Sequence, residues 1–484
     1  MRRAVIFVIV ASWLGLLAVL VRKQVPPAPL PATPLPDTGI AARDEWFGLY
    51  KDGHKIGHAH RVVAEATSGW VFTETSVVAL AMLGTPQTLR SELRAETDAH
   101  FAVRQFAYTL VTPAATFVAS GTSDDHTLRA RYGPKGQESD LVLPLTEPIA
   151  LPSTLRPRVL ADHPEPGARY TLPVFSPLTA QTEPLTIVVE GRERLSTKGG
   201  VVDTLRIAEE HQNVKTRAWL DDDGNVVREE AVLGFTLERE PHEVAVAGAD
   251  TATPIDLAVA SGIPLEGTIA EPRELTGLSL RLSGTAADRV PSAPPRQLVV
   301  ADRLTVTRES VPAEAPALGT VPPELDATLA ASPFIESDDA AIRTQARTIV
   351  GSATDPRTVA RNLVAWVHAE VEKAPSVTVP SAREVLASRR GDCNEHAVLL
   401  AALARAAGIP ARVVAGAVYA NDGFYYHAWN ELWVGAWVSA DAIFDQLPAD
   451  ATHVKLIEGG LEKQMALMGI IGQLAFAVVE ETPR

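Results

Sequence analysis

The chain has 484 residues, more than one ordinary domain holds, so we expect two or three domains. Hydrophobic residues make up 46% of it, enough to build cores, and its 36 prolines favour strands and loops over a helical bundle. The formal net charge of −15 argues against a nucleic-acid partner, which would require a basic face. Because Cys393 is the only cysteine, no intramolecular disulfide can form.

Residues 1–21 predict a membrane anchor. Met-Arg-Arg precedes an uncharged apolar run from Ala4 to Val21, which as a helix would span about 27 Å, close to the hydrocarbon thickness of a bilayer. A cleaved signal peptide is the competing interpretation, but its apolar region is usually shorter and ends in a small-x-small site. Here Val21 leads directly into Arg22 and Lys23. We therefore favour an uncleaved signal anchor in the inner (cytoplasmic) membrane, with the bulk of the chain outside the cytoplasm, in the periplasm.

The next segments predict a linker and β-rich structure. Residues 22–42 contain six prolines, typical of an extended, semi-rigid spacer. Residues 43–245 predict a β-rich domain, because turn residues separate stretches of alternating polarity such as Gly69 to Val78. Within this region, Ala218 to Glu230 predicts a hairpin with an Asp-Gly turn. Residues 246–330 stay rich in proline and β-branched residues, and they form either a small β module or a connector.

Two polar clusters in the β-rich region raise the question of a metal site. The first consists of three histidines on one predicted hairpin, His54, His58 and His60. Surface histidines are the commoner case there, so we expect no metal. The second is the acidic turn at 221–223, which lacks the ligand spacing and the distal glutamate of an EF-hand loop. We therefore expect a plain hairpin at this turn, and no cofactor in the chain.

From about residue 331 the pattern becomes helical, and we assign residues 331–484 to a last domain. Ser337 is a candidate N-cap for one helix, and Asp355 followed by Pro356 is typical of the start of another. Apolar residues then recur at helical spacing, which predicts that this second helix buries one face.

The centre of this domain predicts a buried helix on an antiparallel sheet. Ser381 and Glu384 have the spacing of a capping box for a short helix. The next helix, from Cys393 to Ala407, has no polar face, so we expect the rest of the domain to pack around it. Three strand-like runs follow, at residues 412–418, 424–434 and 437–440. The fold class predicted for this domain is α+β.

The position of Cys393 favours nucleophilic chemistry. At a helix N-terminus, the macrodipole and the free backbone N–H groups favour an anion, so we expect the thiol pKa to fall. The same N–H groups can hold the oxyanion that forms when a thiolate attacks a carbonyl. A base and a group that orients it are also needed. His427 lies on a predicted strand and Asp441 at the end of the next one, so the two can pair across the hairpin. The order Cys393, His427, Asp441 is nucleophile, base and orienter.

These motifs resemble the transglutaminase-like superfamily. The resemblance implies a papain-like α+β core with a Cys-His-Asp triad, carried here by Cys393, His427 and Asp441. The whole arrangement is similar to membrane-anchored bacterial members, whose β-rich region precedes the catalytic core. The family's aspartate is often followed by Pro-Thr, whereas Ala442 and Ile443 stand here. The matching stretches are residues 391–397, 406–412, 427–429, 437–441 and 444–456.

The triad and the resemblance together predict thiol-dependent acyl transfer on protein or peptide amides. Transfer of the resulting thioester to an amine makes a crosslinking transglutaminase, whereas transfer to water makes a cysteine protease or amidase. The sequence leaves the acceptor open.

Two alternatives are weaker. A zinc site at Cys393, His396 and His427 has a Cys-x-x-His spacing, but the chain offers no second cysteine. A non-catalytic envelope binding or scaffold protein with a degenerate core is the alternative from another class. A degenerate core would have lost at least one of the three triad residues, and all three are present.

Overall fold

The computed structural model describes residues 42–483 apart from short gaps. The gaps are residues 161–163, 212–213, 249–253, 376–377, 461–462, 464–466 and 468. The predicted anchor at 1–21 and all but the last residue of the predicted linker at 22–42 therefore lie outside the described residues. Among the helices that are described, none combines the length and the apolar character needed to cross a bilayer.

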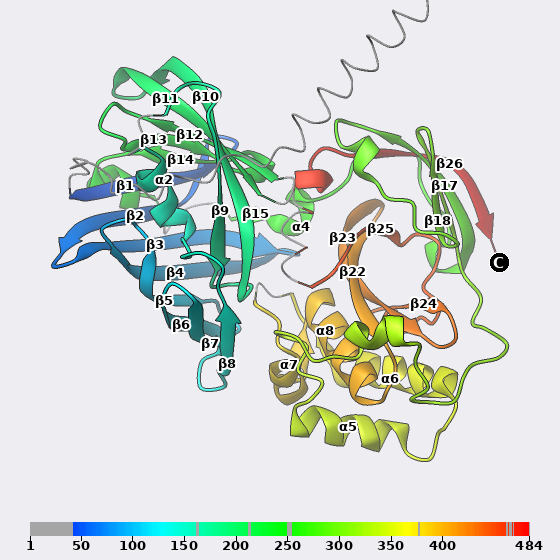
Figure 1. Ribbon diagram of the computed structural model, residues 1–484. Coiled ribbons are helices and arrows are strands. Elements are labelled where there is room, and N and C mark those ends of the chain that lie inside the picture. The colour runs from blue at the N-terminus through cyan, green and yellow to red at the C-terminus, as the bar shows by residue number, and fades with distance from the viewer. Residues whose placement is uncertain are drawn as a thin grey trace, which may run out of the picture.

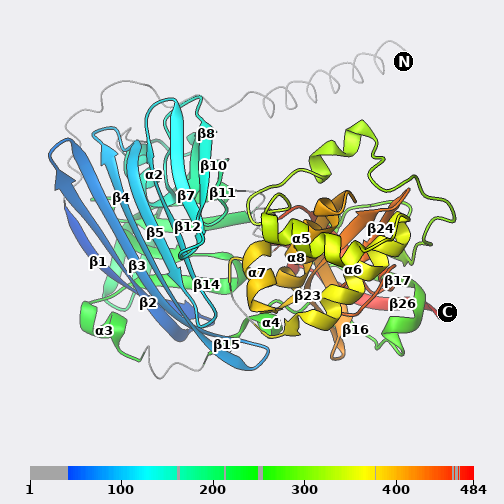
Figure 2. The same cartoon turned by 90° about the horizontal axis from the view of Figure 1, so that it is seen from below.

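The first half of the chain forms a 15-stranded sheet, in keeping with its alternating polarity (Figures 1 and 2). Strands β1 to β8 follow one another as neighbours in one direction, and β14 to β9 follow in the other. Pairing of β1 with β14 joins the two runs, and β15 adds to β3 in parallel. The strands are β1 (Arg43–Lys51), β2 (His54–Ala66), β3 (Gly69–Met82), β4 (Thr85–Asp98), β5 (Val103–Val111), β6 (Thr116–Ser123), β7 (Thr127–Pro134), β8 (Ser139–Pro144), β9 (Arg169–Ser176), β10 (Gln181–Thr197), β11 (Gly200–His211), β12 (Val214–Leu220), β13 (Val226–Glu230), β14 (Phe235–Arg239) and β15 (Ile255–Asp256).

Helix α2 (Pro152–Leu160) packs on this sheet, where its Leu155 and Val159 join a buried apolar cluster with strand residues. Two short helices, α3 (His242–Val246) and α4 (Leu257–Ala260), lie in the segment that leaves the sheet.

The polar clusters of this region have protein partners. Strands β12 and β13 form the hairpin expected at the acidic turn, where Asp221 Oδ1 accepts the Asn225 backbone N–H at 2.8 Å. On β2, the ring of His60 stacks on Trp46 at 4.0 Å, and its Nε2 lies 2.7 Å from Asp44 Oδ1. These contacts give both groups a structural role in the sheet.

A second sheet of five strands follows, in the order β16-β26-β17-β19-β18. Its strands are β16 (Leu265–Glu266), β17 (Leu275–Ser283), β18 (Gln297–Val300), β19 (Arg303–Thr307) and β26 (Ala475–Pro483). The segment predicted as a β module or a connector is thus a β structure, which the C-terminal strand completes. The predicted domain boundary at residue 330 stays a prediction. Strand β26 comes from the last predicted domain, but it pairs with β17 in the segment before that boundary.

The third sheet has four strands in the order β24-β23-β22-β25. Its strands are β22 (Ala411–Ala420), β23 (Gly423–Trp433), β24 (Trp437–Ala440) and β25 (Val454–Glu458). Helices lie on one side of it, as Figure 1 shows, and the five-stranded sheet packs on the other through a shared apolar cluster. The helices are α5 (Ala340–Val350), α6 (Pro356–Glu370), α7 (Ala382–Ser388) and α8 (Cys393–Ala406), and the short strands β20 (Glu372–Lys373) and β21 (Arg390–Gly391) pair just before α8. The predicted α+β arrangement of helices on an antiparallel sheet is confirmed.

The predicted cap at Ser337 is wrong, and Ser381 occupies the predicted N-cap position of α7 but its side chain makes no capping bond. Asp339, not Ser337, caps α5, because its Oδ1 accepts the Ala341 N–H at 2.7 Å. Ser381 precedes α7 as expected, but its hydroxyl donates to Glu336 Oε1 at 2.6 Å instead of to the helix. In both cases a nearby carboxylate accepts the hydrogen bond, and the sequence pattern alone does not locate it.

Candidate active site

Helix α8 carries Cys393 at its first position. Residues 395–404 are all buried, because the helix lies between β22 and β23 on one side and α5, α6 and α7 on the other. Asp392 caps the helix and accepts the Asn394 N–H at 2.8 Å, while Glu395 Oε2 accepts the Asp392 N–H at 2.8 Å. This reciprocal capping box fixes the first turn of α8, and with it the backbone of Cys393.

The Cys393 thiol is half-buried and lies among carboxyl groups. Burial raises its pKa well above the ordinary value and the Asp392 carboxylate adds to the rise, whereas the Ala428 backbone N–H opposes it. The lowered pKa expected from the helix N-terminus is therefore wrong for the thiol taken alone, because desolvation and nearby acidic groups outweigh it. A thiolate at this position needs a cation beside it.

His427 and Asp441 are brought together as the sequence predicted. Strands β23 and β24 pair antiparallel, and Asp441 directly follows β24. His427 Nε2 lies 2.6 Å from Asp441 Oδ2, and both side chains are buried. Burial by itself would raise the pKa of Asp441, but His427 and His453 hold it well below the ordinary value. Asp441 is thus an anion, and His427 Nε2 must donate its N–H to it.

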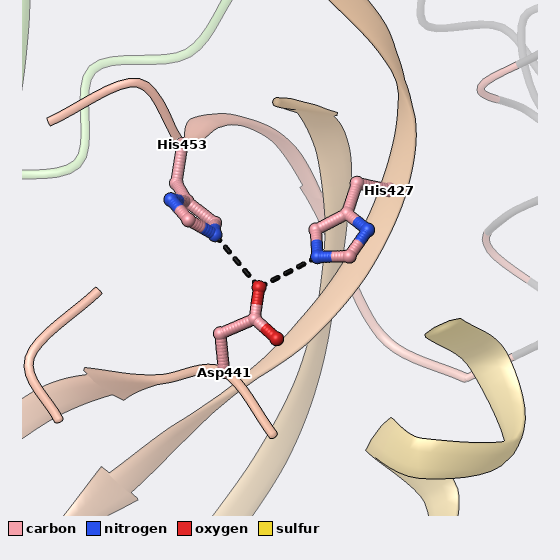
Figure 3. Close-up of side chains that lie close together, drawn as sticks. All are labelled: His427, Asp441 and His453. Atoms are coloured by element: carbon pink, nitrogen blue, oxygen red, sulfur yellow. Dashed lines mark hydrogen bonds and ion pairs between the residues drawn. The ribbon is translucent and has the colours of Figure 1, made fainter. Parts of the chain in front are cut away.

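The second ring nitrogen of His427, Nδ1, points away from Asp441 (Figure 3). In the neutral ring this nitrogen is a proton acceptor, because the single ring proton is on Nε2. Contacts on both sides of His427 tie β23 to α8. Tyr426 Oη donates to Asn394 Oδ1 at 2.7 Å, and Asn430 Nδ2 donates to the Ala397 carbonyl at 2.9 Å. The Ala428 N–H also faces the thiol, so the strand that carries His427 lies against the start of α8.

The structure adds His453 to this site, a residue that sequence reasoning missed. His453 is fully buried, and its Nε2 lies 2.8 Å from the same Oδ2 atom of Asp441 (Figure 3). The other carboxylate oxygen, Oδ1, accepts the backbone N–H groups of Ile443 and Phe444 at 2.6 and 3.3 Å. Residues 444–456 were noted as part of the family resemblance, but nothing in the sequence assigned His453 a role.

Aromatic side chains line the candidate site. Trp429 stacks near His427 with ring centroids 6.1 Å apart, and Phe444 lies 5.5 Å from the same ring. Trp429 is buried, as expected of a packing residue. Together these rings restrict water around the imidazole, which strengthens its interaction with Asp441.

Among the residues that the structure describes, the side chains that gather closely enough to hold a metal are His427, Asp441 and His453, with one ligand atom each within 4.8 Å of the others. They differ from the predicted zinc alternative, which combined Cys393 and His396 with His427. In this structure both imidazoles point Nε2 at the carboxylate, so the three residues satisfy one another as hydrogen-bond partners. His396 instead places Nδ1 2.7 Å from the Asp392 carbonyl, and burial lowers its pKa.

Comparison with known proteins gives the class of this region. Residues 343–442 match the family model of the transglutaminase-like superfamily, so the C-terminal part contains a transglutaminase-like domain. The match covers Cys393, His427 and Asp441 and ends before His453. No curated protein shows significant similarity to the chain.

Several solved structures show a weak likeness. A candidate cysteine protease from Cytophaga hutchinsonii is 16% identical with a TM-score of 0.27, and the alignment covers 43% of this chain and 87% of that one. A β-barrel-like protein from Brucella abortus is 12% identical with a TM-score of 0.32, covering 42% and 95%. A candidate protease from Parabacteroides distasonis is 13% identical with a TM-score of 0.20, covering 68% and 64%. Likenesses at such TM-scores define no activity for this chain.

Proposed function

We propose that the protein is a thiol-dependent acyltransferase or hydrolase acting on protein or peptide amides. The observation that carries the proposal is the His427–Asp441 pair. It leaves Nδ1 of His427 on the side of the ring away from Asp441, and the strand of His427 packs on α8, which begins with the only cysteine of the chain. The transglutaminase-like match over the same three residues supports it.

In the first step, Cys393 gives its proton to His427 Nδ1 and its sulfur attacks the amide carbonyl carbon. Because burial and the nearby Asp392 disfavour a lone thiolate, the negative sulfur forms only as the imidazolium forms. The carbonyl oxygen becomes an oxyanion, which the N-terminal N–H groups of α8 can stabilise. His427 then gives the proton to the departing nitrogen, the C–N bond breaks, and a thioester on Cys393 remains.

The second step decides the class of enzyme. Attack by water with His427 as the base releases a carboxylic acid, whereas attack by an amine gives a new amide and a crosslink. We favour hydrolysis or acyl transfer on an envelope protein, because the apolar run at residues 4–21 would tether the site to a membrane. Membrane fractionation combined with protease accessibility tests the proposed location outside the cytoplasm.

The experiment that tests the proposal is the pH dependence of Cys393 alkylation in the full chain, solubilised in a mild detergent. A single cysteine makes the signal specific. We expect alkylation to persist well below pH ~8.5, where an ordinary thiol titrates. We expect His427→Ala to remove that reactivity and shift the remaining titration upward, because burial and acidic neighbours then act on the thiol without a cation.

The matched control is His368→Ala. His368 lies on α6 and contacts the Ala442 carbonyl at 3.0 Å, so this change removes a nearby imidazole outside the pair. Alkylation with a raised pKa that is indifferent to His427 would contradict the proposal, and it would favour the non-catalytic scaffold. If the proposal holds, mass spectrometry of thioester turnover on a glutamine peptide, with and without a primary amine, distinguishes the two acceptors.

A further inference from the structure

The Asp441 carboxylate accepts hydrogen bonds from two imidazoles at a single oxygen. His427 Nε2 is 2.6 Å and His453 Nε2 is 2.8 Å from Oδ2, and the two ring centroids are 5.7 Å apart (Figure 3). A Cys-His-Asp triad requires only the first of these bonds. The second is made by a side chain with no exposed surface, so it requires its own physical account.

The surroundings of His453 fix its protonation state. Its Nε2 faces the ionised Asp441, and its Nδ1 lies 3.2 Å from Asp450 Oδ1 and 3.3 Å from the Asp450 carbonyl. Both ring nitrogens therefore face oxygen acceptors, and only the imidazolium carries a proton on each. Burial by itself would lower the pKa of His453, but Asp450 and Asp441 raise it above its ordinary value.

The charges continue beyond His453. Asp450 Oδ2 accepts from Arg273 Nη1 at 2.6 Å, and Asp450 Oδ1 accepts the Thr452 N–H at 2.8 Å. Burial opposes ionisation of Asp450, but His453 and Arg273 hold its pKa well below the ordinary value. Arg273 belongs to a short 3-10 helix, Pro272–Glu274, just before β17 of the five-stranded sheet. The resulting row alternates in sign from Asp441 through His453 and Asp450 to Arg273.

We propose that His453 is a positioning residue, held as a buried imidazolium by Asp450 and Arg273, that shares the charge of Asp441 so that His427 binds its proton less tightly. The inference rests on the proposed function, in which His427 first accepts and then donates a proton. A histidine paired with an unshared carboxylate keeps its proton strongly and is a poor acid toward the departing amine. The cation on the far side of Asp441 offsets part of that attraction.

The two aromatic rings packed against His427 and His453 carry no charge. Phe444 and Trp429 contact both imidazoles, and neither ionises. On the α8 side the titratable groups are Cys393, Asp392, Glu395 and His396, and on the loop side Arg273 lies over the Phe444 ring at 4.1 Å. His453 also completes the set of four hydrogen bonds to Asp441, two at each oxygen. These bonds fix the plane of the carboxylate, and the carboxylate in turn fixes the orientation of the His427 ring.

The first test measures the pKa of His427 by imidazole nitrogen NMR on the histidine-labelled full chain in detergent. A Cys393→Ala background removes the thiol, so that His427 titrates alone. We expect His453→Gln, which keeps an N–H donor and removes the cation, to raise the His427 pKa by about one unit. The conservative Arg273→Lys should leave the pKa of His427 near its value in the unmodified row, because it keeps the positive charge beside Asp450. His368→Gln is the control for the same substitution outside the row.

An unchanged His427 pKa in folded His453→Gln protein would overturn the inference. A second measurement needs no variant that changes His453. In the unmodified chain, the nitrogen shifts of His453 should show both ring protons at about pH 8, well above the ordinary histidine pKa. A neutral His453 at that pH would overturn the inference equally.

The two proposals fail in different ways. If alkylation of Cys393 depends on His427 but the His427 pKa ignores His453, the proposed function stands and this inference is overturned. If alkylation ignores His427 while His453 stays doubly protonated and shifts the His427 pKa, the charge sharing is supported and the acyl-transfer function is overturned.

Discussion

At the scale of single residues, Asp441 and Asp450 link the site to the stability of the fold. Both are buried anions whose pKa in the folded chain lies well below the ordinary value, despite the opposing effect of burial. In the unfolded chain an aspartate titrates near ~3.9. A carboxylate with a depressed folded pKa contributes stability that is fully present above the unfolded pKa and is lost as pH falls through the folded one.

We therefore expect the free energy of unfolding to decrease steadily as pH falls below about 4. Denaturant titrations at a series of pH values measure this decrease. Asp450→Asn should lower stability at neutral pH and flatten the decrease, because one of the two anions is gone. Asp338→Asn, at an exposed position, is the matched control. The same slope in wild-type and Asp450→Asn protein would show that Asp450 plays no part in the acid response.

The residues of the site could be predicted to different extents. The sequence could predict Cys393, His427 and Asp441, because each stands in a motif that has a chemical meaning. The sequence could not predict the role of His453 or Arg273, because that role depends on partners that only the fold brings close. Arg273 is 177 residues from Asp450 in the sequence. The raised pKa of the thiol taken alone was not foreseen, because a helix N-terminus is visible in a sequence and desolvation is not.

At the scale of elements, the pairing of β22 with β25 holds His453 in place, since β25 begins at the next residue. The pairing is irregular between Ala415 and Gly416, and a Cβ at Gly416 would lie 2.0 Å from the Val454 carbonyl oxygen and 3.1 Å from Trp429. Because the first of these atoms is backbone, the strand itself would have to move. The absence of a side chain at Gly416 is therefore required for this close approach.

We expect Gly416→Ala to lower the free energy of unfolding by about 1–3 kcal/mol, the usual effect of overpacking a core. It should also reduce the alkylation rate of Cys393 at neutral pH, because moving Val454 moves His453. Chemical denaturation and the alkylation assay measure the two effects. Gly199→Ala is the control, since the nearest atom to its added Cβ is Thr197 Oγ1 at 3.8 Å. Wild-type stability in Gly416→Ala would mean that β25 can shift without cost.

Elements with strong local patterns were predictable, and their connections were not. The apolar helix ending at Gly408, the hairpin at 218–230 and the three strands after α8 lie close to where the patterns placed them. The cap of α5 was wrong, and Ser381 stands at the N-cap of α7 without capping it through its side chain, because several polar residues near each helix start could serve. That β26 completes the sheet of residues 265–307 could not be read locally, since its partner strand is about two hundred positions away.

At the scale of the whole molecule, the three sheets are joined by shared apolar clusters. The four-stranded sheet has helices on one face and the five-stranded sheet on the other, so residues of both flanks reach the candidate site. The large N-terminal sheet meets the helical side at the buried residues Phe334 and Val379, and Arg383 of α7 donates to the Gln137 carbonyl. The ring of Phe334 lies 6.1 Å from Phe117 and 5.5 Å from Tyr132, while its carbonyl accepts the Ala382 N–H at 2.9 Å.

Phe334 therefore couples the N-terminal sheet to the transglutaminase-like domain, and Phe334→Ala should weaken that coupling. Truncating a buried phenylalanine costs about 3–5 kcal/mol. We expect calorimetry to show two separate unfolding transitions in the variant where the unmodified chain shows closely coupled ones. The alkylation of Cys393 at neutral pH should persist, because Phe334 touches none of the charged row. Leu83→Ala, at a position that is 62% exposed on the same sheet, is the control. If both transitions moved down together and stayed coupled, other contacts would join the two parts, and the N-terminal sheet would be an integral support of the transglutaminase-like domain rather than a separable one.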